Sequence, residues 1–312
     1  MHVLLLTRPQ PTAAFREAIH ALAPEITVHE ELAGLDAADP ALIEALVCYR
    51  LPKGVCARLP NLKVVCASSA GVDKILPVPD LPAHVAVARV VDAAQNAQIA
   101  QYVAMMALRH VRNAPLYERQ QREKAWTRHP IPAPDGCTVG LLGLGASGQR
   151  VAASLGALGF RLAGWSRSPR TLPGIDCYSG SEGLGQCLAR ADILVCLLPL
   201  TDDTRGLLGR ENLSRLPRGA YLINVARGEH VNEPELLALL DEGHLSGAAL
   251  DVQSREPLPP ESPLWTHPAV TVTPHVASQP TPQAVAAQVV ENMRRLQAGR
   301  PLANAVDRRT GY

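Results

Sequence analysis

The sequence has few aromatic residues and almost no excess of charge, and each feature excludes a class of partner. Phenylalanine, tryptophan and tyrosine make up 4% of the 312 residues, too few for the stacking platforms that hold single-stranded nucleic acids. Thirty lysine and arginine residues balance 29 aspartate and glutamate residues, so the formal net charge is +1. Without a basic surplus the chain has no electrostatic attraction to nucleic acid or to an anionic membrane. We therefore expect neither as a partner.

Cysteine is present, but not in patterns that bind metals. None of the seven cysteines belongs to a C-x-x-C pair, and no His/Cys cluster has the spacing of metal ligands, so we predict no metal site. Cys48, Cys66, Cys137 and Cys196 lie in or beside apolar runs, as small core residues of a protein in a reducing, cytoplasmic setting do. The apolar start, residues 1–6, is too short for a signal peptide or a membrane span.

Low-complexity tracts are absent too, and apolar runs alternate instead with amphipathic segments. Hydrophobic residues make up 47% of the chain, enough for two domains with sizeable cores. The alternation predicts parallel sheets with helices on both faces. The expected strands are His2–Leu6, Ile26–Val28, Ala45–Tyr49, Leu62–Ala67 and Val85–Val90, then Thr138–Leu142, Arg161–Trp165, Ile193–Leu197, Tyr221–Asn224, Gly247–Val252 and Val270–Val272. The expected helices include Thr12–Leu22, Pro40–Leu46, Ala93–Arg112, a continuation over Arg112–Trp126, Ser147–Leu158 and Thr281–Leu296.

The stretch Gly143-Leu144-Gly145-Ala146-Ser147-Gly148 has the pattern G-x-G-x-x-G between an expected strand and an expected helix. That context separates a dinucleotide-binding turn from the glycine-rich turn of any other α/β protein. Gly143 permits the tight turn, Gly145 lets the backbone approach a pyrophosphate, and Gly148 lets the helix pack against its strand. The phosphates would meet backbone N–H groups at the helix N-terminus.

A long helix is expected to connect two units. Asp92 is the expected N-cap of the helix that starts at Ala93, and the last helix, although it follows the second unit, is expected to pack on the first. The predicted fold class is α/β, with two Rossmann-like or flavodoxin-like doubly wound parallel-sheet domains and a cleft between them. We predict a substrate domain over residues 1–98 plus 279–312 and a dinucleotide-binding domain over residues 99–278.

The strand after the glycines ends in Trp165-Ser166-Arg167-Ser168, without the acidic residue that NAD sites place about 20 residues past the glycines. An arginine and hydroxyl groups suit a ribose 2′-phosphate, because a guanidinium matches its oxygens in a fork. Arg167 could also be an ordinary solvated side chain at a loop tip. We predict NADPH as the cofactor, with NADH as a weaker alternative.

Three further polar residues follow the later strands of the second unit. Arg227 comes after Tyr221–Asn224, Glu256 after Gly247–Val252, and His275 after Val270–Val272. Singly, each fits a surface ion pair or an ordinary loop residue. Together they follow strands whose carboxyl ends share one edge, which is where open α/β sheets bind ligands.

The glycine turn, Leu197–Thr201, Asn224–Gly228, Glu256–Pro259 and Thr273–His275 resemble the D-isomer-specific 2-hydroxyacid dehydrogenase family. The resemblance covers most of the chain and is most specific from the glycine turn onward. Within the family, the chain is most similar to NADPH-dependent glyoxylate/hydroxypyruvate reductases.

The resemblance implies a role for each matching residue. Arg227 would hold the substrate's carboxylate and carbonyl oxygen, His275 would bind the substrate and donate the proton, and Glu256 would orient His275. Backbone N–H groups of Ala70 and Gly71 would bind the carboxylate. Asp251 and the Val225 carbonyl would hold the nicotinamide amide. The other implied cofactor contacts are Ala146, Ser147, Leu198, Pro199, Thr204 and Ala226.

The implied activity is NADPH-dependent reduction of small 2-oxoacids such as glyoxylate and hydroxypyruvate, by a homodimer built mainly on the dinucleotide domain through the stretch Ala97–Trp126. Two alternatives stay open: an NAD-linked dehydrogenase of another D-2-hydroxy acid, and a non-catalytic interaction protein that senses dinucleotides. Formate dehydrogenases of this fold have Gln where Glu256 stands. Tyr49, Arg50 and Trp126 are candidates for selecting substrate size.

Overall fold

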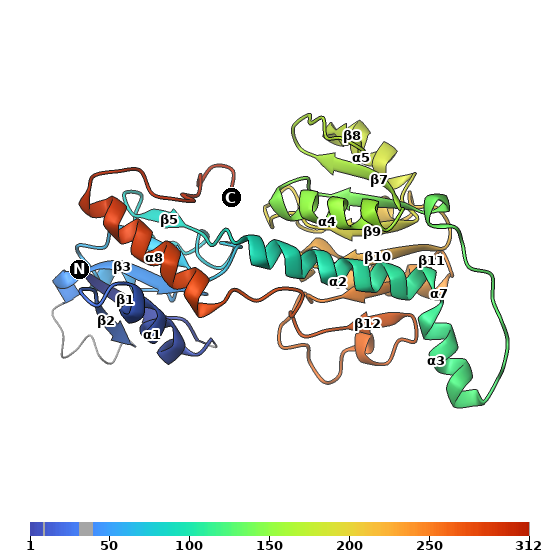
Figure 1. Ribbon diagram of the computed structural model, residues 1–312, viewed down its shortest axis with the longest axis horizontal. Coiled ribbons are helices and arrows are strands. Elements are labelled where there is room, and N and C mark those ends of the chain that lie inside the picture. Colours follow the sequence, from blue (N-terminus) through green and yellow to red (C-terminus); the bar gives the residue numbers. More distant parts are fainter. Residues whose placement is uncertain (9, 31–39, 312) are drawn as a thin grey trace. The chain divides into compact units, whose positions relative to one another are not determined.

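A computed structural model describes residues 1–8, 10–30 and 40–311. The chain forms two compact units, one made of Met1–Gln95 with Gln279–Tyr312 and the other of Asn96–Ser278. Figure 1 labels most of their helices and strands. Each unit contains one sheet, and the two sheets are described separately below.

The first unit has a five-stranded parallel sheet in the order β2-β1-β3-β4-β5. Its strands are β1 (His2–Leu6), β2 (Thr27–Glu30), β3 (Ile43–Cys48), β4 (Val64–Ala67) and β5 (Ala86–Ala88). Helices α1 (Thr12–Leu22) and α8 (Pro282–Gln297) pack together on one face, and η3 (Cys56–Arg58) lies with loop residues on the other. The last helix therefore packs on the first unit, as predicted.

The prediction of a helix over residues 40–46 is wrong. Only η2, Pro40–Leu42, is helical, as a single 3-10 turn, and β3 begins at Ile43. This strand pairs with β1 on one side and β4 on the other, and residues 45–48 are fully buried. A run buried on both faces shows no alternation, so its periodicity does not separate a strand from a buried helix.

The second unit has a seven-stranded parallel sheet in the order β12-β11-β10-β9-β6-β7-β8. Its strands are β6 (Thr138–Leu142), β7 (Arg161–Ser166), β8 (Asp176–Ser179), β9 (Ile193–Cys196), β10 (Ala220–Asn224), β11 (Leu245–Leu250) and β12 (Val270–Val272). The sequence did not predict β8, an edge strand that pairs only with β7 and has no fully buried residue. The order of the strands and their parallel direction match those of a doubly wound dinucleotide-binding sheet.

Helices cover both faces of this second sheet. The helices α2 (Ala93–Val111) and α4 (Ala146–Ala157) pack on one face, and α5 (Gly180–Leu188), α6 (Arg210–Leu213) and α7 (Glu233–Asp241) pack on the other. Asp92 Oδ1 accepts from the Ala94 N–H at 2.9 Å, so the predicted start of α2 is correct. Both faces of the sheet are thereby removed from water, as a parallel sheet requires.

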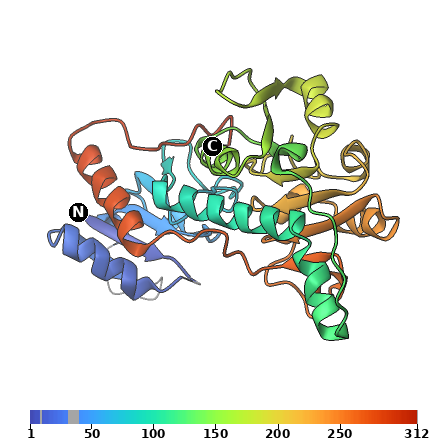
Figure 2. The ribbon, with the colours of Figure 1, turned by 45° about the vertical axis from the view of Figure 1, so that its right-hand side comes forward.

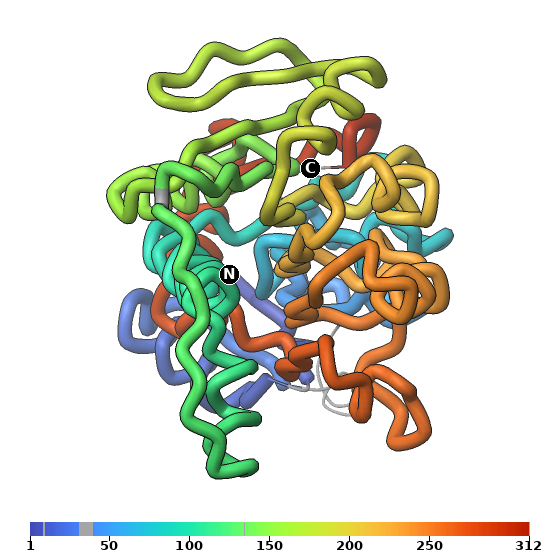
Figure 3. The backbone as a smooth tube through the Cα atoms, turned by 90° about the vertical axis from the view of Figure 1, so that its right-hand side faces the viewer, coloured from blue at the N-terminus to red at the C-terminus, as the bar shows by residue number. Residues whose placement is uncertain are grey.

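The helix predicted to continue to Trp126 is interrupted after α2. Asn113 has φ 54°, in the left-handed region, and α3 (Ala114–Glu123) starts after it without burying a residue. Figure 2 shows α3 projecting beyond α2, and Figure 3 shows the chain returning beside it toward β6. The returning segment is held by Asn113 Nδ2, which donates to Pro130 O at 3.1 Å, and by the His129 N–H, which donates to Tyr117 Oη at 3.1 Å.

Candidate active site

The sheet of the second unit brings the residues predicted for the site to one edge. All seven strands are parallel, so the segments that follow them emerge at the same side. The chain runs outward from β6 through β7 to β8, then returns to β9 and continues to β12 on the other side of β6. The carboxyl ends of β6 and β9 therefore form the topological switch point, where open α/β sheets bind ligands.

The three glycines after β6 have three different surroundings. Gly143 has φ 107°, and a Cβ there would lie 2.9 Å from Leu197 O. A Cβ on Gly148 would lie 2.0 Å from Gly143 O, which leaves no space for a side chain. A Cβ on Gly145 would meet no heavy atom within 4 Å. Two of the glycines are therefore required by the protein's own packing, while Gly145 faces open space that a ligand could fill.

The start of α4 provides donors for an anion. Its N-cap is Gly145, so no side chain caps the first-turn N–H groups, and these groups together with the helix dipole favour a phosphate. Ser147 Oγ donates to Asn96 Oδ1 at 2.6 Å, which ties the glycine turn to α2. These features fit a pyrophosphate beside the Gly145 backbone.

The turn after β7 has the character expected of a 2′-phosphate site. Ser166 Oγ donates to Ser168 O at 2.8 Å, which fixes the turn, and Arg167 is exposed. No aspartate or glutamate occurs from residue 162 to residue 175. The segment therefore provides hydroxyl and guanidinium groups where an acidic residue would otherwise repel a phosphate.

The loop after β9 is closed by Thr204. Its hydroxyl donates to Pro199 O at 2.7 Å and accepts from the Thr201 N–H at 2.8 Å. Leu198 is buried and Pro199 is exposed. The three residues predicted as cofactor contacts in this loop are thus parts of one turn whose shape depends on the Thr204 hydroxyl.

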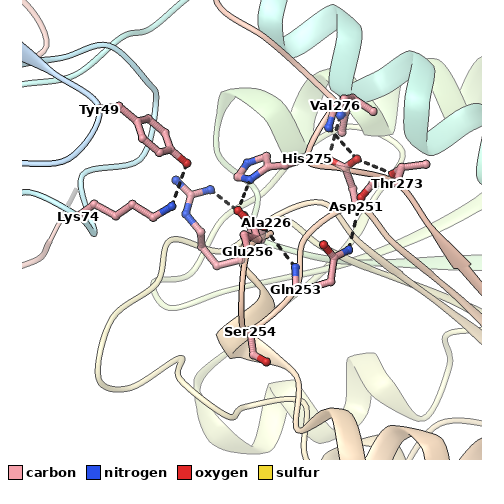
Figure 4. A network of polar contacts seen from close by, with 12 residues as sticks. Tyr49, Lys74, Ala226, Asp251, Gln253, Ser254, Glu256, Thr273, His275 and Val276 are labelled. Carbon is pink, nitrogen blue, oxygen red and sulfur yellow. Dashed lines mark hydrogen bonds and ion pairs between the residues drawn. The ribbon is translucent and has the colours of Figure 1, made fainter. Parts of the chain in front are cut away.

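His275 and Glu256 form a direct pair. His275 Nδ1 lies 3.0 Å from Glu256 Oε2, and the two side chains are 31% and 26% exposed. Figure 4 shows the imidazole directed at the carboxylate. The Gln253 N–H donates to the other carboxylate oxygen, Oε1, at 3.3 Å. With Nδ1 directed at Glu256, Nε2 is the ring nitrogen that remains for proton transfer.

The backbone of His275 is held in an unusual conformation. Its φ is 56°, in the left-handed region that a residue with a side chain rarely adopts. The His275 N–H donates to Asp251 O at 2.8 Å. A strained backbone fixed in this way directs the imidazole toward the carboxyl edge of the sheet.

Asp251 holds the same loop through its carboxylate. The side chain is buried and accepts from Thr273 Oγ1 at 2.6 Å, from the Val276 N–H at 2.9 Å and from the Ala277 N–H at 2.8 Å. A carboxylate has about four acceptor positions. Because three donors occupy three of them, about one acceptor position of Asp251 remains for a ligand. In the described structure Asp251 fixes the loop of His275, a function that the sequence analysis did not predict.

Tyr102 extends this network to α2. Its hydroxyl lies 2.7 Å from Thr273 Oγ1, and burial raises the pKa of Tyr102 to about 12. The phenol therefore stays protonated near physiological pH. Because Thr273 Oγ1 donates its own proton to Asp251, the Tyr102 hydroxyl donates to Thr273 Oγ1. The chain Tyr102, Thr273 and Asp251 links α2, the end of β12 and the end of β11.

Arg227 follows β10 in a tightly packed turn. Asn224 is fully buried, and its amide accepts from the Ala226 N–H at 3.1 Å and donates to Arg227 O at 2.8 Å. Arg227 Nη1 donates to Ala226 O at 2.7 Å. A Cβ on Gly228 would lie 1.9 Å from Gln253 C, so only glycine fits there. The backbone that carries the Arg227 guanidinium is therefore fixed on both sides.

Sequence reasoning missed three polar residues that support this edge, of which two are buried and Thr273 is partly buried. Asn224, His230 and Thr273 contact the backbone or side chains of predicted site residues. Two signals were available: Asn224 and His230 flank Arg227 within seven positions of sequence, and Asn224 and Thr273 lie in the stretches that carry the family resemblance. Their burial and their partners became visible only in the folded unit.

The first unit carries the remaining predicted residues at the carboxyl edge of its own sheet. Ala70 and Gly71 follow β4, and Ser69 Oγ donates to Gly71 O at 2.9 Å. Tyr49 follows β3, and its hydroxyl accepts from Lys74 Nζ at 3.0 Å, as Figure 4 shows. Arg50 is exposed, as is Trp126 of the second unit.

Neither a candidate metal site nor a membrane-spanning helix was found in the described residues. Within residues 1–8, 10–30 and 40–311, no three His, Cys, Asp or Glu side chains form a group that could hold a metal ion. No helix in the same part of the chain is both long enough and apolar enough to cross a membrane.

Comparisons with known proteins agree with the dinucleotide-binding fold of the second unit. The family model "D-isomer specific 2-hydroxyacid dehydrogenase, NAD binding domain" matches residues 104–277, more than half of the chain. The chain is 42% identical to a D-isomer specific 2-hydroxyacid dehydrogenase from Xanthobacter autotrophicus Py2 crystallised with NADPH and MES, with a TM-score of 0.95 over 100% of this chain and 99% of that one.

Two further solved structures are similar over nearly their whole lengths. An NADPH-dependent glyoxylate/hydroxypyruvate reductase from Sinorhizobium meliloti, in complex with NADP and sulfate, is 36% identical with a TM-score of 0.92, covering 100% of this chain and 99% of that one. A probable 2-hydroxyacid dehydrogenase from Rhizobium etli CFN 42, in complex with NADP, HEPES and L(+)-tartaric acid, is 32% identical with a TM-score of 0.91, covering 99% of both chains. The sheet order, the glycine turn and these matches together show that the chain belongs to the D-isomer specific 2-hydroxyacid dehydrogenase family.

Proposed function

We propose that this protein is an NADPH-dependent reductase that converts small 2-oxoacids to 2-hydroxy acids, with glyoxylate and hydroxypyruvate as substrates. The observation that carries the proposal is the contact of 3.0 Å between His275 Nδ1 and Glu256 Oε2, at the edge where Arg227 also emerges. A proton donor and a fixed positive charge are the two groups that reduction of a carbonyl next to a carboxylate requires.

The chain's residues fit a dinucleotide with a 2′-phosphate. The open space at Gly145 and the uncapped start of α4 suit the pyrophosphate, and Ser166 with Arg167 suits the 2′-phosphate. Ala146, Ser147, Leu198, Pro199, Thr204, Ala226, the Val225 carbonyl and Asp251 are the other assigned contacts. Bound NADPH would supply the hydride. The relatives crystallised with NADPH or NADP support this choice over NADH.

The substrate's charges determine the roles of the protein residues. Arg227 binds the carboxylate and the carbonyl oxygen, and its charge opposes the negative charge that grows on that oxygen in the transition state. Ala70 and Gly71 add backbone N–H donors for the carboxylate. His275, in its protonated form, gives a proton to the oxygen, and the Glu256 carboxylate stabilises the imidazolium beforehand. Proton donation by a positioned side chain contributes roughly 10²–10⁴-fold in rate.

A turnover assay tests the proposal directly. Purified protein should oxidise NADPH in the presence of glyoxylate or hydroxypyruvate, with a higher kcat/KM for NADPH than for NADH. The His275→Ala variant should lose most of the rate while it keeps its affinity for NADPH. No turnover with any of a panel of 2-oxoacids would refute the proposal and favour a dinucleotide-sensing interaction protein. Turnover with NADH alone would favour an NAD-linked dehydrogenase.

The proposed assembly is a homodimer built on the second unit. Trp126 is 93% exposed, and Met105, Leu108 and Ile131 are also exposed apolar side chains on α2 and the segment after α3. Contiguous exposed apolar side chains are typical of an interaction surface, and Met105 and Leu108 lie about one helical turn apart on α2.

The cysteines support the proposed reducing, cytoplasmic location. All seven are free thiols, and six of them are buried. Burial raises the pKa of the Cys66 thiol to about 12 and that of the Cys187 thiol to about 12. Such thiols stay protonated and behave as small core residues.

A further inference from the structure

We propose that His230 is a positioning residue that ties the backbone of Arg227 to the loop after β9. The inference rests on the proposed function, in which Arg227 binds the substrate and Pro199 lies in a cofactor-binding loop. His230 itself is fully buried, at 0% exposure, so it acts through other residues. It ends the short turn η5 (Gly228–His230), which follows Arg227 directly.

The imidazole contacts both segments at once. Nδ1 lies 3.2 Å from the Arg227 backbone nitrogen and 3.0 Å from the Arg227 carbonyl oxygen. Nε2, on the opposite side of the ring, lies 3.3 Å from Pro199 O. Pro199 and Arg227 follow neighbouring strands, β9 and β10, so the ring spans the two segments at the carboxyl edge of the sheet.

The chemistry of a neutral imidazole matches this pair of partners. A neutral ring has one donor nitrogen and one acceptor nitrogen. With the proton on Nε2, the ring donates to the Pro199 carbonyl and Nδ1 accepts from the Arg227 N–H, and we infer this tautomer from these two partners. The Arg227 carbonyl oxygen, which also lies near Nδ1, takes its hydrogen bond from Asn224 Nδ2. An amide side chain reproduces only one contact: asparagine places a polar atom near the Nδ1 position, and glutamine places one near the Nε2 position.

The contacts of His230 complete the support around Arg227. Asn224 Nδ2 donates to Arg227 O at 2.8 Å, so Asn224 fixes the carbonyl side of the residue while His230 binds its N–H. Pro199 O accepts from Thr204 Oγ1 as well as lying near His230 Nε2. Loss of the acceptor at Nδ1 would remove the hydrogen bond from the Arg227 N–H to His230, and the backbone would shift in response. A shift of about 1 Å in a substrate-binding group can cost about 100-fold in rate.

Two amide variants separate the two contacts. His230→Gln should keep the contact with Pro199 and lose the one with Arg227. The KM for glyoxylate at saturating NADPH should therefore rise about tenfold or more, which corresponds to the loss of about 1.4 kcal/mol of binding free energy. His230→Asn should keep the contact with Arg227 and lose the one with Pro199, so its loss of affinity for NADPH should exceed its increase in KM for glyoxylate. Thermal unfolding and NADPH titration of each variant show whether it is folded.

A matched control comes from the same unit. His244 is partly buried, whereas His230 is fully buried, and the Nε2 of His244 likewise lies 3.3 Å from a backbone carbonyl, that of Leu213. His244→Gln therefore makes the same chemical change away from the site. It should leave both kinetic constants within about twofold.

Two outcomes would overturn the inference. In one, His230→Gln and His230→Asn show the same pattern of KM and NADPH affinity. In the other, His230→Gln leaves KM unchanged. If the unmodified protein reduces no 2-oxoacid, the proposed function itself fails. The His230 inference is then tested by titrating oxalate into the NADPH-loaded protein, where His230→Gln should bind oxalate more weakly than His244→Gln.

Discussion

The two glycines Gly145 and Gly148 allow a sharp test of the dinucleotide site, because the same substitution meets opposite surroundings three positions apart. Replacing Gly148 by alanine places a Cβ 2.0 Å from Gly143 O, whereas replacing Gly145 places it in open space. Gly148 lies inside α4, where alanine would otherwise stabilise the helix by about 1 kcal/mol. Any loss of stability in Gly148→Ala must therefore come from the close contact.

The expected magnitudes follow from this contrast. Overpacking costs about 1–3 kcal/mol and the helix gain offsets about 1 kcal/mol of it, so Gly148→Ala should lower the free energy of unfolding by up to about 2 kcal/mol. For a unit of this size, each kcal/mol corresponds to about 2–4 °C in Tm. Gly145→Ala should change stability by less than about 0.5 kcal/mol. Its methyl group would occupy the space assigned to the pyrophosphate, so its affinity for NADPH should fall at least tenfold.

Thermal unfolding and fluorescence titration with NADPH measure both effects on the same samples. Gly136→Ala serves as the control, because a Cβ there also meets nothing within 4 Å and the residue precedes the glycine turn. It should match the unmodified protein in both measurements. If Gly145→Ala binds NADPH as tightly as Gly136→Ala, the pyrophosphate does not approach Gly145 and the assigned cofactor site is wrong.

Three other predictions address charge, proton transfer and assembly. Glu256→Gln keeps the shape of the carboxylate but removes the negative charge that lies 3.0 Å from His275 Nδ1, so kcat/KM for the reduction of glyoxylate should fall. An unchanged kcat/KM would make Glu256 a structural residue. Arg167→Asp should weaken NADPH binding through charge repulsion and improve the use of NADH; equal kcat/KM for both cofactors in the unmodified protein would contradict the assignment. Light scattering at micromolar concentration should give the mass of a dimer for the unmodified protein and a mass closer to that of a monomer for the Trp126→Glu variant. A monomer mass for the unmodified protein would contradict the proposed dimer.

Local patterns in the sequence were sufficient for much of the fold. The buried strands, the glycine turn and the start of α2 depend on neighbouring residues, and those signals predicted them correctly. At the start of α7, Asn232 Oδ1 accepts from the Glu235 N–H at 3.3 Å, which is one half of a capping-box pattern. The other half of that pattern is absent, because Glu235 Oε2 accepts from the Arg210 N–H at 2.5 Å. A residue 25 positions away thus decides where the carboxylate is directed.

Tertiary structure alone decided the features that depend on distant partners. The polar edge strand β8 has no apolar pattern and forms because β7 offers an unpaired edge. Tyr102, Thr273 and Asp251 are far apart in sequence, and the hydrogen bonds that hold the His275 loop exist only once α2, β11 and β12 have packed. The sequence alone determined which residue types end each strand, since strand ends and glycine turns are local. Which of those residues contact each other, as His275 contacts Glu256 and His230 contacts both Arg227 and Pro199, was decided by the order of strands in the sheet, because that order determines which loops are neighbours.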